Sequence, residues 1–525
     1  MMNVEPPNGS DAPPERRERE ERTGAAVNDY VAMVARHRPY RDTSPRRTIP
    51  FRDFRQEVRR HRPSDLLPTL AALALAGGDP PFSAQWLATM PPWAIALAAR
   101  ESILWGNEHR KEGVTGDDLR RLFNAHNDVV GVPRERDDNF VLGMLTQVAY
   151  EQFPYQESIF EEVSRTHALL VDGLSAVNLE VLSEKAWEEM LGAPLGQVVG
   201  ATFFLQVAAS KNAGWFDHKW LDRPDMQEIY DVWPREVIER RALELSSTFE
   251  EFKAAYHAAP HPPDGNERYS FNPLVERPFV RMNDGRYLAP QPRLILRTIT
   301  PGALYYRGIR ALGEPFARDL GKLTERYVGR QLKSIKPTPD LYPEILYGKP
   351  EQASTDWFLV LPSVVVMFEV KSARFGLLER AAAPGFEKRT KSLIDKAVGQ
   401  LIRSSTEIDA RNPAFEHIPS DRPRIGVLVT AEPHYLANSH WTRETVQQAP
   451  FPTLTASLRD IELLAALPLD EVERQLVEIA NDPDRSTWSL GTAFDRSKKQ
   501  GPNVVLQEAW DSYPWLEELD IDEDQ

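Results

Sequence analysis

The sequence predicts a mixed α/β domain in the C-terminal part of the chain, preceded by a mostly α-helical domain. Apolar residues recur at helical spacing from about residue 28 to 258, whereas short apolar runs of strand length alternate with helical patterns from about 301 to 470. A proline-rich stretch at 257–263 separates the two regions. The length of 525 residues also exceeds what one hydrophobic core usually serves, so more than one domain is expected.

The composition excludes several classes of function. Hydrophobic residues make up 41% and charged residues 27%, as in ordinary soluble proteins. No apolar run approaches the roughly 20 residues that span a bilayer, and the N-terminus lacks the apolar core of a signal peptide, so we expect a cytoplasmic protein without a membrane partner. The chain has no cysteine, which excludes disulfides, thiol nucleophiles and cysteine-ligated metals. The net charge of −15 argues against a generally basic surface but is compatible with a local basic groove.

The chain divides into five expected segments. They are a disordered segment at 1–24, an α-helical domain at 25–258, a Pro-rich linker and β-hairpin at 259–300, the α/β domain at 301–470, and a C-terminal helix with an acidic tail at 471–525. In the helical domain, Thr115 is an expected helix N-cap. The hairpin is expected because a turn signal, Asn283-Asp284-Gly285, lies between two short apolar runs.

The sequence of residues 301–470 predicts an alternation of helices and strands. The expected elements, in order, are a helix at 312–335, two strands within 355–371 joined by Pro362-Ser363, a helix at 387–407, strands at 424–430 and 453–457, and a helix at 459–467. The second strand of the pair is almost continuously apolar and then ends in Glu369 and Lys371.

Charged residues at the end of that strand are the best candidates for chemistry. Side chains alternate across a strand, so Glu369 and Lys371 share one face. Asp356 opens the preceding strand, and the start of one antiparallel strand lies beside the end of the next. Burying such charges costs free energy unless something compensates for it, and a divalent metal and a phosphate would do so.

This pattern resembles the PD-(D/E)XK nuclease superfamily, which has the restriction-endonuclease-like fold. The similarity covers roughly residues 312–467 and is closest to the nuclease-related and Holliday-junction-resolvase-like branches. The motif positions are Asp356 and the triplet Glu369-Val370-Lys371, with Glu325 on the helix before them and Gln400 on the helix after them. Thr355 stands where the family name has proline.

The resemblance implies a role for each of these residues. Asp356, Glu369 and the Val370 carbonyl would hold Mg²⁺ or Mn²⁺, with Glu325 binding a second ion. Such an ion activates water and neutralises the scissile phosphate. Lys371 would orient the water or stabilise negative charge, and Gln400 would position Lys371 or the phosphate.

Local charge agrees with a nucleic-acid substrate. From Val366 to Arg403 we count eight basic and four acidic residues, a balance of +4 in an acidic chain. The expected phosphate-binding residues are Arg374, Lys388, Arg389, Lys391, Lys396 and Arg403.

The resulting expectation is a metal-dependent endonuclease acting on DNA, in bacterial defence against phage or plasmid DNA. A ribonuclease and a catalytically inactive module that binds nucleic acid or a partner are the alternatives. The helical N-terminal domain gives no mechanism, and homo-oligomer formation or binding of a partner protein are the roles we consider for it.

Overall fold

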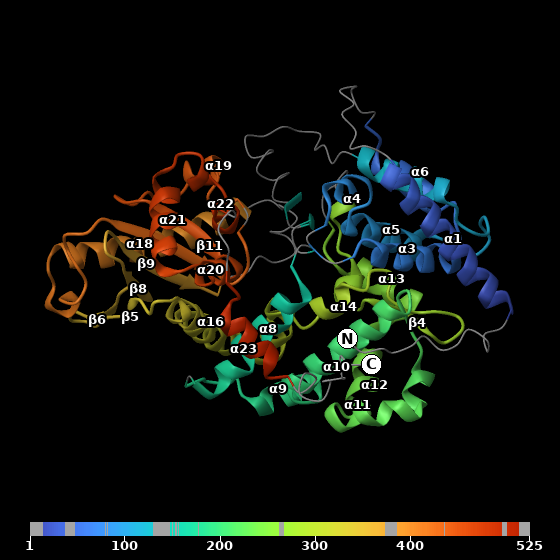
Figure 1. Ribbon diagram of the computed structural model, residues 1–525, viewed down its shortest axis with the longest axis horizontal. Coiled ribbons are helices and arrows are strands. Elements are labelled where there is room, and N and C mark those ends of the chain that lie inside the picture. Colours follow the sequence, from blue (N-terminus) through green and yellow to red (C-terminus); the bar gives the residue numbers. More distant parts are fainter. Residues whose placement is uncertain are drawn as a thin grey trace, which may run out of the picture.

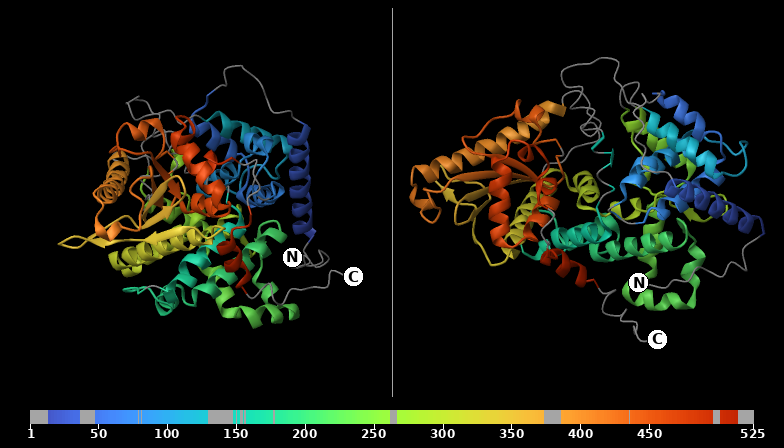
Figure 2. Two further views of the ribbon diagram at one scale, coloured as in Figure 1. Left: turned by 60° about the vertical axis from the view of Figure 1, so that its left-hand side comes forward. Right: turned by 45° about the horizontal axis from the view of Figure 1, so that its top comes forward.

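The N-terminal helices and the α/β region lie at opposite ends of the molecule (Figure 1). The computed structural model describes residues 14–36, 48–78, 80, 82–129, 148–149, 151–152, 155, 157–176, 178–261, 267–372, 386–434, 436–495 and 501–513. Helices of the middle of the chain, drawn in teal and green, join the two ends (Figures 1 and 2). The acidic tail after residue 513 and residues 1–13 lie outside the described residues.

Six helices build the N-terminal end: α1 (Pro14–Arg36), α2 (Phe51–Val58), α3 (Pro63–Ala76), α4 (Ala84–Thr89), α5 (Pro92–Trp105) and α6 (Gly116–Asp128). As predicted, Thr115 is the N-cap of α6, in a capping box with Asp118. Residues 14–24, which we expected to be disordered, are the first turns of α1. Oppositely charged residues spaced four apart, such as Arg16 and Glu20, support this helix.

The middle of the chain adds α8 (Ile159–Leu170), α9 (Glu184–Leu191), α10 (Leu195–Lys211), α11 (Gln227–Val232), α12 (Arg235–Glu244) and α13 (Phe249–Ala258). The predicted hairpin is confirmed as β3 (Phe279–Arg281) and β4 (Tyr287–Leu288), and its turn residue Gly285 has a φ of 83°. The hairpin joins β1 (Trp215–Phe216) and β2 (Ser246–Ser247) in a sheet with the order β1-β4-β3-β2.

The segment expected as a linker contributes side chains to the two largest hydrophobic clusters of the described residues. Val280 and Leu288 belong to the N-terminal cluster, whereas Phe279 and Tyr287 belong to the cluster that also contains the α/β region. The small sheet therefore connects the two cores through its two faces.

The α/β region contains a five-stranded sheet with the order β11-β10-β9-β8-β5. Its strands are β5 (Asp340–Pro343), β8 (Trp357–Val360), β9 (Val365–Lys371), β10 (Arg424–Thr430) and β11 (Thr453–Ser457). The strands β9, β10 and β11 run parallel, and β8 is antiparallel to both β9 and β5. A two-stranded ribbon of β6 (Leu346–Tyr347) and β7 (Gln352–Ala353) precedes β8.

Helices cover both faces of this sheet. Val366 and Phe368 of β9 point to the large cluster, where α16 (Glu314–Ser334) and α20 (Leu458–Ala465) pack. Val365 and Met367 point to the opposite face, which Leu401 of α18 (Phe386–Asp409) covers. The helices and strands predicted from 312 to 467 are present in the predicted order, but β5, β6, β7 and α19 (His440–Arg443) were not predicted. The result is α/β packing in three layers (Figure 2).

The remaining helices are α14 (Leu294–Arg297), α15 (Pro301–Leu312), α19 (His440–Arg443), α21 (Leu469–Asn481), α22 (Leu490–Ala493) and α23 (Val504–Asp511). The helix expected near the C-terminus is α23, which packs beside α8 (Figure 1). No single described helix has the length and apolar character to cross a membrane. One bent pair, α9 with α10, passes that test by length and composition.

Close packing between α16 and β8 depends on a glycine. A Cβ at Gly329 would lie 2.0 Å from the Trp357 ring, whereas a Cβ at Gly321 on the same helix would meet its nearest neighbour at 3.7 Å. We expect Gly329→Ala to destabilise the protein by about 1–3 kcal/mol, because the Trp357 ring must move. Gly321→Ala should stabilise it by up to about 1 kcal/mol through helix propensity. Urea denaturation of both variants measures this, and shifts of the same sign would contradict it.

Candidate active site

Asp356 and Glu369 meet where the β8–β9 hairpin ends. Trp357 pairs with Phe368 across the two antiparallel strands, so Asp356, just before Trp357, lies beside Glu369, just after Phe368. The Asp356 carboxylate accepts a hydrogen bond from the Val370 backbone N–H, with 2.5 Å between nitrogen and Oδ2. The predicted meeting of these residues at one rim of the sheet is what the structure shows.

Glu369 is fully buried and is held from two sides. The Lys371 ammonium donates to Glu369 Oε1. The Thr355 hydroxyl donates to the Phe368 carbonyl at 2.7 Å and lies 3.2 Å from Glu369 Oε2. Because a hydroxyl has one proton and the shorter contact is to the Phe368 carbonyl, Thr355 mainly holds the β9 backbone next to Glu369.

Gln400 on α18 contacts the hairpin, although not in the predicted way. Its side-chain Nε2 donates to the Ser354 carbonyl at 2.7 Å. One turn later on α18, Ser404 Oγ accepts from the Thr355 N–H at 2.8 Å. We expected Gln400 to position Lys371 or a phosphate, but its amide N–H holds the chain before Asp356 instead. The residue that pairs with Lys371 is Glu369.

Glu325 approaches the same rim from α16. Its backbone carbonyl accepts a hydrogen bond from Trp357 Nε1 at 3.0 Å. Desolvation and, to a smaller extent, the charges of Asp356 and Glu344 raise the pKa of Glu325 to about 7, against the opposing effect of Lys371. Glu344, in the segment between β5 and β6, was missed by the sequence interpretation because it belongs to none of the motif positions.

Electrostatics at this rim favour a cation. Burial raises the pKa of Asp356, and burial together with the Asp356 charge raises the pKa of Glu369. Lys371 acts against these shifts in Asp356, Glu369 and Glu325. Lys371 has the same effect on Glu344, so four carboxylates share its charge. An added cation would favour the ionised forms of these carboxylates.

Asp356 and Glu369 supply hard oxygen atoms side by side, which suits Mg²⁺ or Mn²⁺. The Val370 carbonyl is the backbone oxygen between Glu369 and Lys371. Within the described ranges, no group of three or more His, Asp or Glu side chains is arranged to hold a metal ion. The structure therefore does not gather Glu325 into one ligand set with Asp356 and Glu369.

Basic residues of α18 form an exposed stripe. Arg389, Lys396 and Arg403 recur every seven residues, which places them on one side of the helix. Gln400, which contacts the hairpin, lies between Lys396 and Arg403 on the sequence. Lys388 is also exposed, and Lys391 is paired with Asp395 on the same helix. Arg374 lies outside the described residues.

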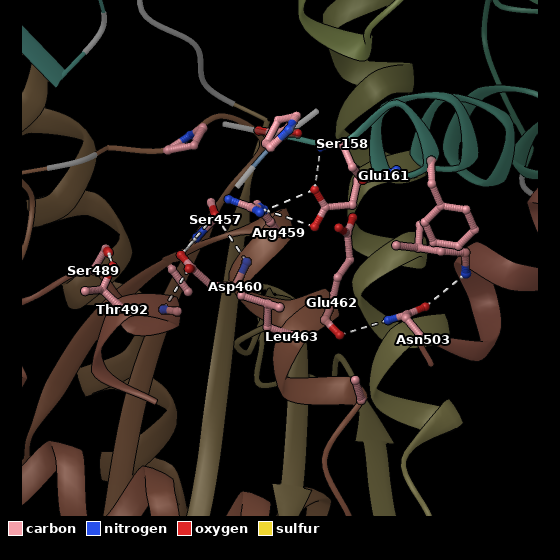
Figure 3. Close-up of a pocket in the computed structure, with 18 of the residues that line it drawn as sticks. Ser158, Glu161, Ser457, Arg459, Asp460, Glu462, Leu463, Ser489, Thr492 and Asn503 are labelled. Atoms are coloured by element: carbon pink, nitrogen blue, oxygen red, sulfur yellow. Dashed lines mark hydrogen bonds and ion pairs between the residues drawn. The ribbon is translucent and has the colours of Figure 1, made fainter. Parts of the chain in front are cut away.

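A separate cavity of about 730 Å³ lies between α8 and α20 (Figure 3). Its polar groups largely bind each other: Arg459 pairs with Glu161 at 3.2 Å, and Asp460 accepts from the Gly491 N–H at 2.7 Å. Ser489 and Thr492 share a hydrogen bond of 2.7 Å. The cavity lacks the carboxylate pair and lysine of the hairpin rim, so we assign the candidate active site to the rim.

Comparison of the chain with known proteins adds no relative. No protein-family model, no curated protein and no solved structure matches it.

Proposed function

We propose that this protein is a metal-dependent nuclease with a restriction-endonuclease-like α/β region, acting on DNA as an endonuclease. The observation that supports it most is the buried pair Asp356 and Glu369 at the end of one hairpin, with Lys371 on the same face. Two buried carboxylates that share the single positive charge of Lys371 are costly, and a divalent ion would offset that cost.

Asp356, Glu369 and the Val370 carbonyl would hold the ion. When bound, Mg²⁺ or Mn²⁺ supplies Lewis-acid stabilisation of the phosphodiester and a more acidic water. The Lys371 side chain contacts Glu369 and is about one-third exposed, so it can also face a phosphate oxygen. Gln400 and Ser404 keep the chain before Asp356 in place. Glu325 adds a carboxylate close enough to Asp356 for their charges to interact.

The basic stripe of α18 supports binding of a polyanion. We expect Lys396→Gln to weaken DNA binding equally for different sequences and to reduce the slope of log K against log salt by about 0.9 for a lost phosphate contact. Lys391→Gln should have a smaller effect because Lys391 already pairs with Asp395. Fluorescence anisotropy from 50 to 300 mM salt measures both, and equal slopes in the wild type and Lys396→Gln would contradict the role of the stripe.

Substrate class is tested by parallel assays of the full chain on double-stranded DNA, single-stranded DNA and RNA of matched length with Mg²⁺. The expected result is cleavage at internal positions of the DNA strands, as by an endonuclease. If only RNA is cleaved, the protein is a ribonuclease and the proposal of a DNA endonuclease is wrong. If the protein binds one of the three nucleic acids but cleaves none, it is a catalytically inactive binding module. Involvement in defence against phage or plasmid DNA would appear as a drop in plating efficiency or plasmid maintenance in bacteria that express the protein.

A further inference from the structure

The helix that carries Glu325 is held on its outer side by the N-terminal half of the chain. The fully buried carboxylate of Asp319 accepts the backbone N–H groups of Glu180, Val181 and Leu182 at 2.7, 2.8 and 2.9 Å. Arg330, further along α16, pairs with Asp172 at 2.8 Å. The inner side of α16 packs on the sheet, so α16 lies between two parts of the molecule.

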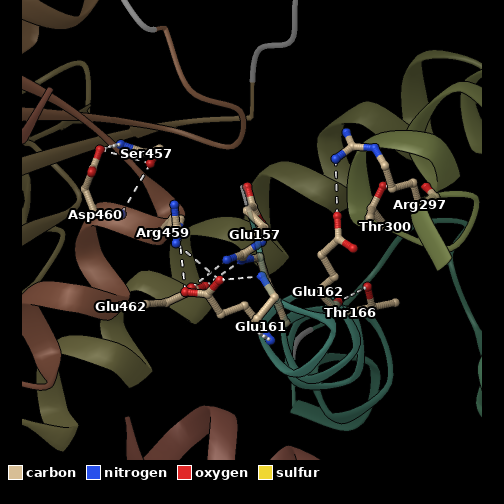
Figure 4. Close-up of polar contacts among 12 residues, drawn as sticks. Glu157, Glu161, Glu162, Thr166, Arg297, Thr300, Ser457, Arg459, Asp460 and Glu462 are labelled. Carbon is tan, nitrogen blue, oxygen red and sulfur yellow. Dashed lines mark hydrogen bonds and ion pairs between the residues drawn. The ribbon is translucent and has the colours of Figure 1, made fainter. Parts of the chain in front are cut away.

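A further buried connection to α16 runs through Arg165 on α8. Arg165 donates to both carboxylate oxygens of Glu462 on α20, at 2.6 and 2.7 Å, and to Glu157 at 2.6 Å. Glu462 Oε1 also accepts from the Tyr327 hydroxyl of α16 at 2.7 Å. Exposed fractions of 9%, 3% and 2% for Arg165, Glu462 and Tyr327 show that water does not compete for these bonds. Figure 4 shows Glu157 and Glu462 facing each other, with Arg459 and Glu161 beside them.

A polar network extends this connection along α16. Gln331 donates to the Tyr327 hydroxyl at 3.0 Å. Asn503, at the start of α23, donates to the Gln331 side chain at 2.7 Å and to the Glu462 carbonyl at 2.9 Å. We call Arg165, Glu462 and Tyr327 the clasp, because they join α8, α20 and α16.

The clasp lies close in sequence to the candidate active site. Tyr327 is two residues beyond Glu325 on α16. The Glu325 carbonyl receives the Trp357 indole N–H, and Trp357 directly follows Asp356. A shift of α16 relative to the sheet would therefore displace the Glu325 carboxylate and disturb the residue next to Asp356.

We propose that Arg165 and Glu462 are positioning residues, which set the place of α16 and thereby of Glu325 through Tyr327. The N-terminal half would then control cleavage through the clasp, an inference that rests on the proposed nuclease function. Removing Arg165 leaves the buried carboxylate of Glu462 without its ion-pair partner, so the local structure must rearrange. A misplacement of about 1 Å at a reacting group can cost on the order of 100-fold in rate.

The test compares full-length variants. Tyr327→Phe removes only the hydroxyl and keeps the Arg165–Glu462 ion pair, and Arg165→Met breaks that pair. Arg318→Ala is the matched control, because Arg318 also lies on α16 in an ion pair, with Glu180, but both partners are exposed. We expect kcat for DNA cleavage to fall about tenfold in Tyr327→Phe and about 10- to 100-fold in Arg165→Met, with KM for DNA within about twofold of the wild type.

A merely stabilising role would leave kcat unchanged in the folded fraction, so all rates are measured well below each melting temperature. Hydrogen exchange of α16 peptides gives a second readout that needs no activity: exchange should accelerate in Arg165→Met and Tyr327→Phe but not in Arg318→Ala. Wild-type kcat and wild-type exchange in Tyr327→Phe would overturn the clasp. If Arg165→Met does not fold, Tyr327→Phe decides. If the wild type cleaves no nucleic acid, the nuclease proposal fails, and the exchange rates still decide on the clasp.

Discussion

Asp356→Asn and Lys371→Ala should each lower Mg²⁺-dependent cleavage by more than about 100-fold while the protein remains folded. Loss of residues that only support metal ligands typically costs 10- to 100-fold, and Asp356 is proposed as a ligand itself. The amide oxygen of asparagine can still accept the Val370 N–H, so the hairpin keeps the bond that it has now. Removing Lys371 takes away the ammonium that faces Glu369.

Asp409→Asn is the matched control for Asp356→Asn. Asp409 is 61% exposed at the far end of α18 and pairs with Arg424 at 2.7 Å. Arg424 is only 10% exposed, but the amide oxygen of asparagine can still accept its hydrogen bond, and Asp409 lies well beyond Gln400 on α18, so this variant should cleave like the wild type. Initial rates on a fluorescent duplex, with circular dichroism of each variant, provide the measurement. A wild-type cleavage rate in Asp356→Asn would show that the Asp356 carboxylate is not part of the active site.

The α/β region should not fold when it is cut out as residues 301–470. The large hydrophobic cluster includes Phe316, Leu320 and Leu323 of α16 together with residues of α8 and α10. Exposing a large apolar side chain costs about 1.5–3 kcal/mol, so exposing these three consumes much of the 5–15 kcal/mol that stabilises a typical domain. The Asp319 carboxylate would also lose the three N–H groups of 180–182 that it binds.

A fragment of residues 157–513 is the control, because it keeps α8, α10 and α23 around α16. We expect a cooperative thermal transition for this fragment and none for 301–470, measured by calorimetry at equal concentration. A sharp transition of the 301–470 fragment would show that the region is an independent domain and would remove the structural basis of control by the N-terminal half.

The central strands of the α/β region could be predicted because their apolar, β-branched sequences do not fit the periodicity of an amphipathic helix. β10 is buried along almost its whole length and reads as a β-branched apolar run, which helical periodicity does not fit. The positions of Asp356, Glu369 and Lys371 follow from strand alternation and antiparallel pairing alone. β5 was missed because it is an edge strand whose residues are half-buried or exposed, so no apolar pattern marks it.

Tertiary contacts decided what the sequence could not. Gln400 has the same polar group whether it faces a phosphate or a backbone carbonyl, and only the fold shows that it binds the Ser354 carbonyl. Glu344 enters the site through the segment between β5 and β6, where no strand and no motif position was predicted. The packing of 259–300 between two cores depends on residues more than 100 positions away, such as Phe123 and Val163, and prolines alone had indicated a linker.

Cleavage of circular DNA by the full-length wild-type protein, after chelation and re-addition of Mg²⁺, tests the central claim most directly. We predict no cleavage in the chelator, and open-circular and linear products once Mg²⁺ is in excess, because Asp356 and Glu369 would then hold the ion that the reaction needs. Equal cleavage with and without the chelator, or no cleavage of DNA or RNA at any Mg²⁺ or Mn²⁺ concentration, would contradict a metal-dependent nuclease.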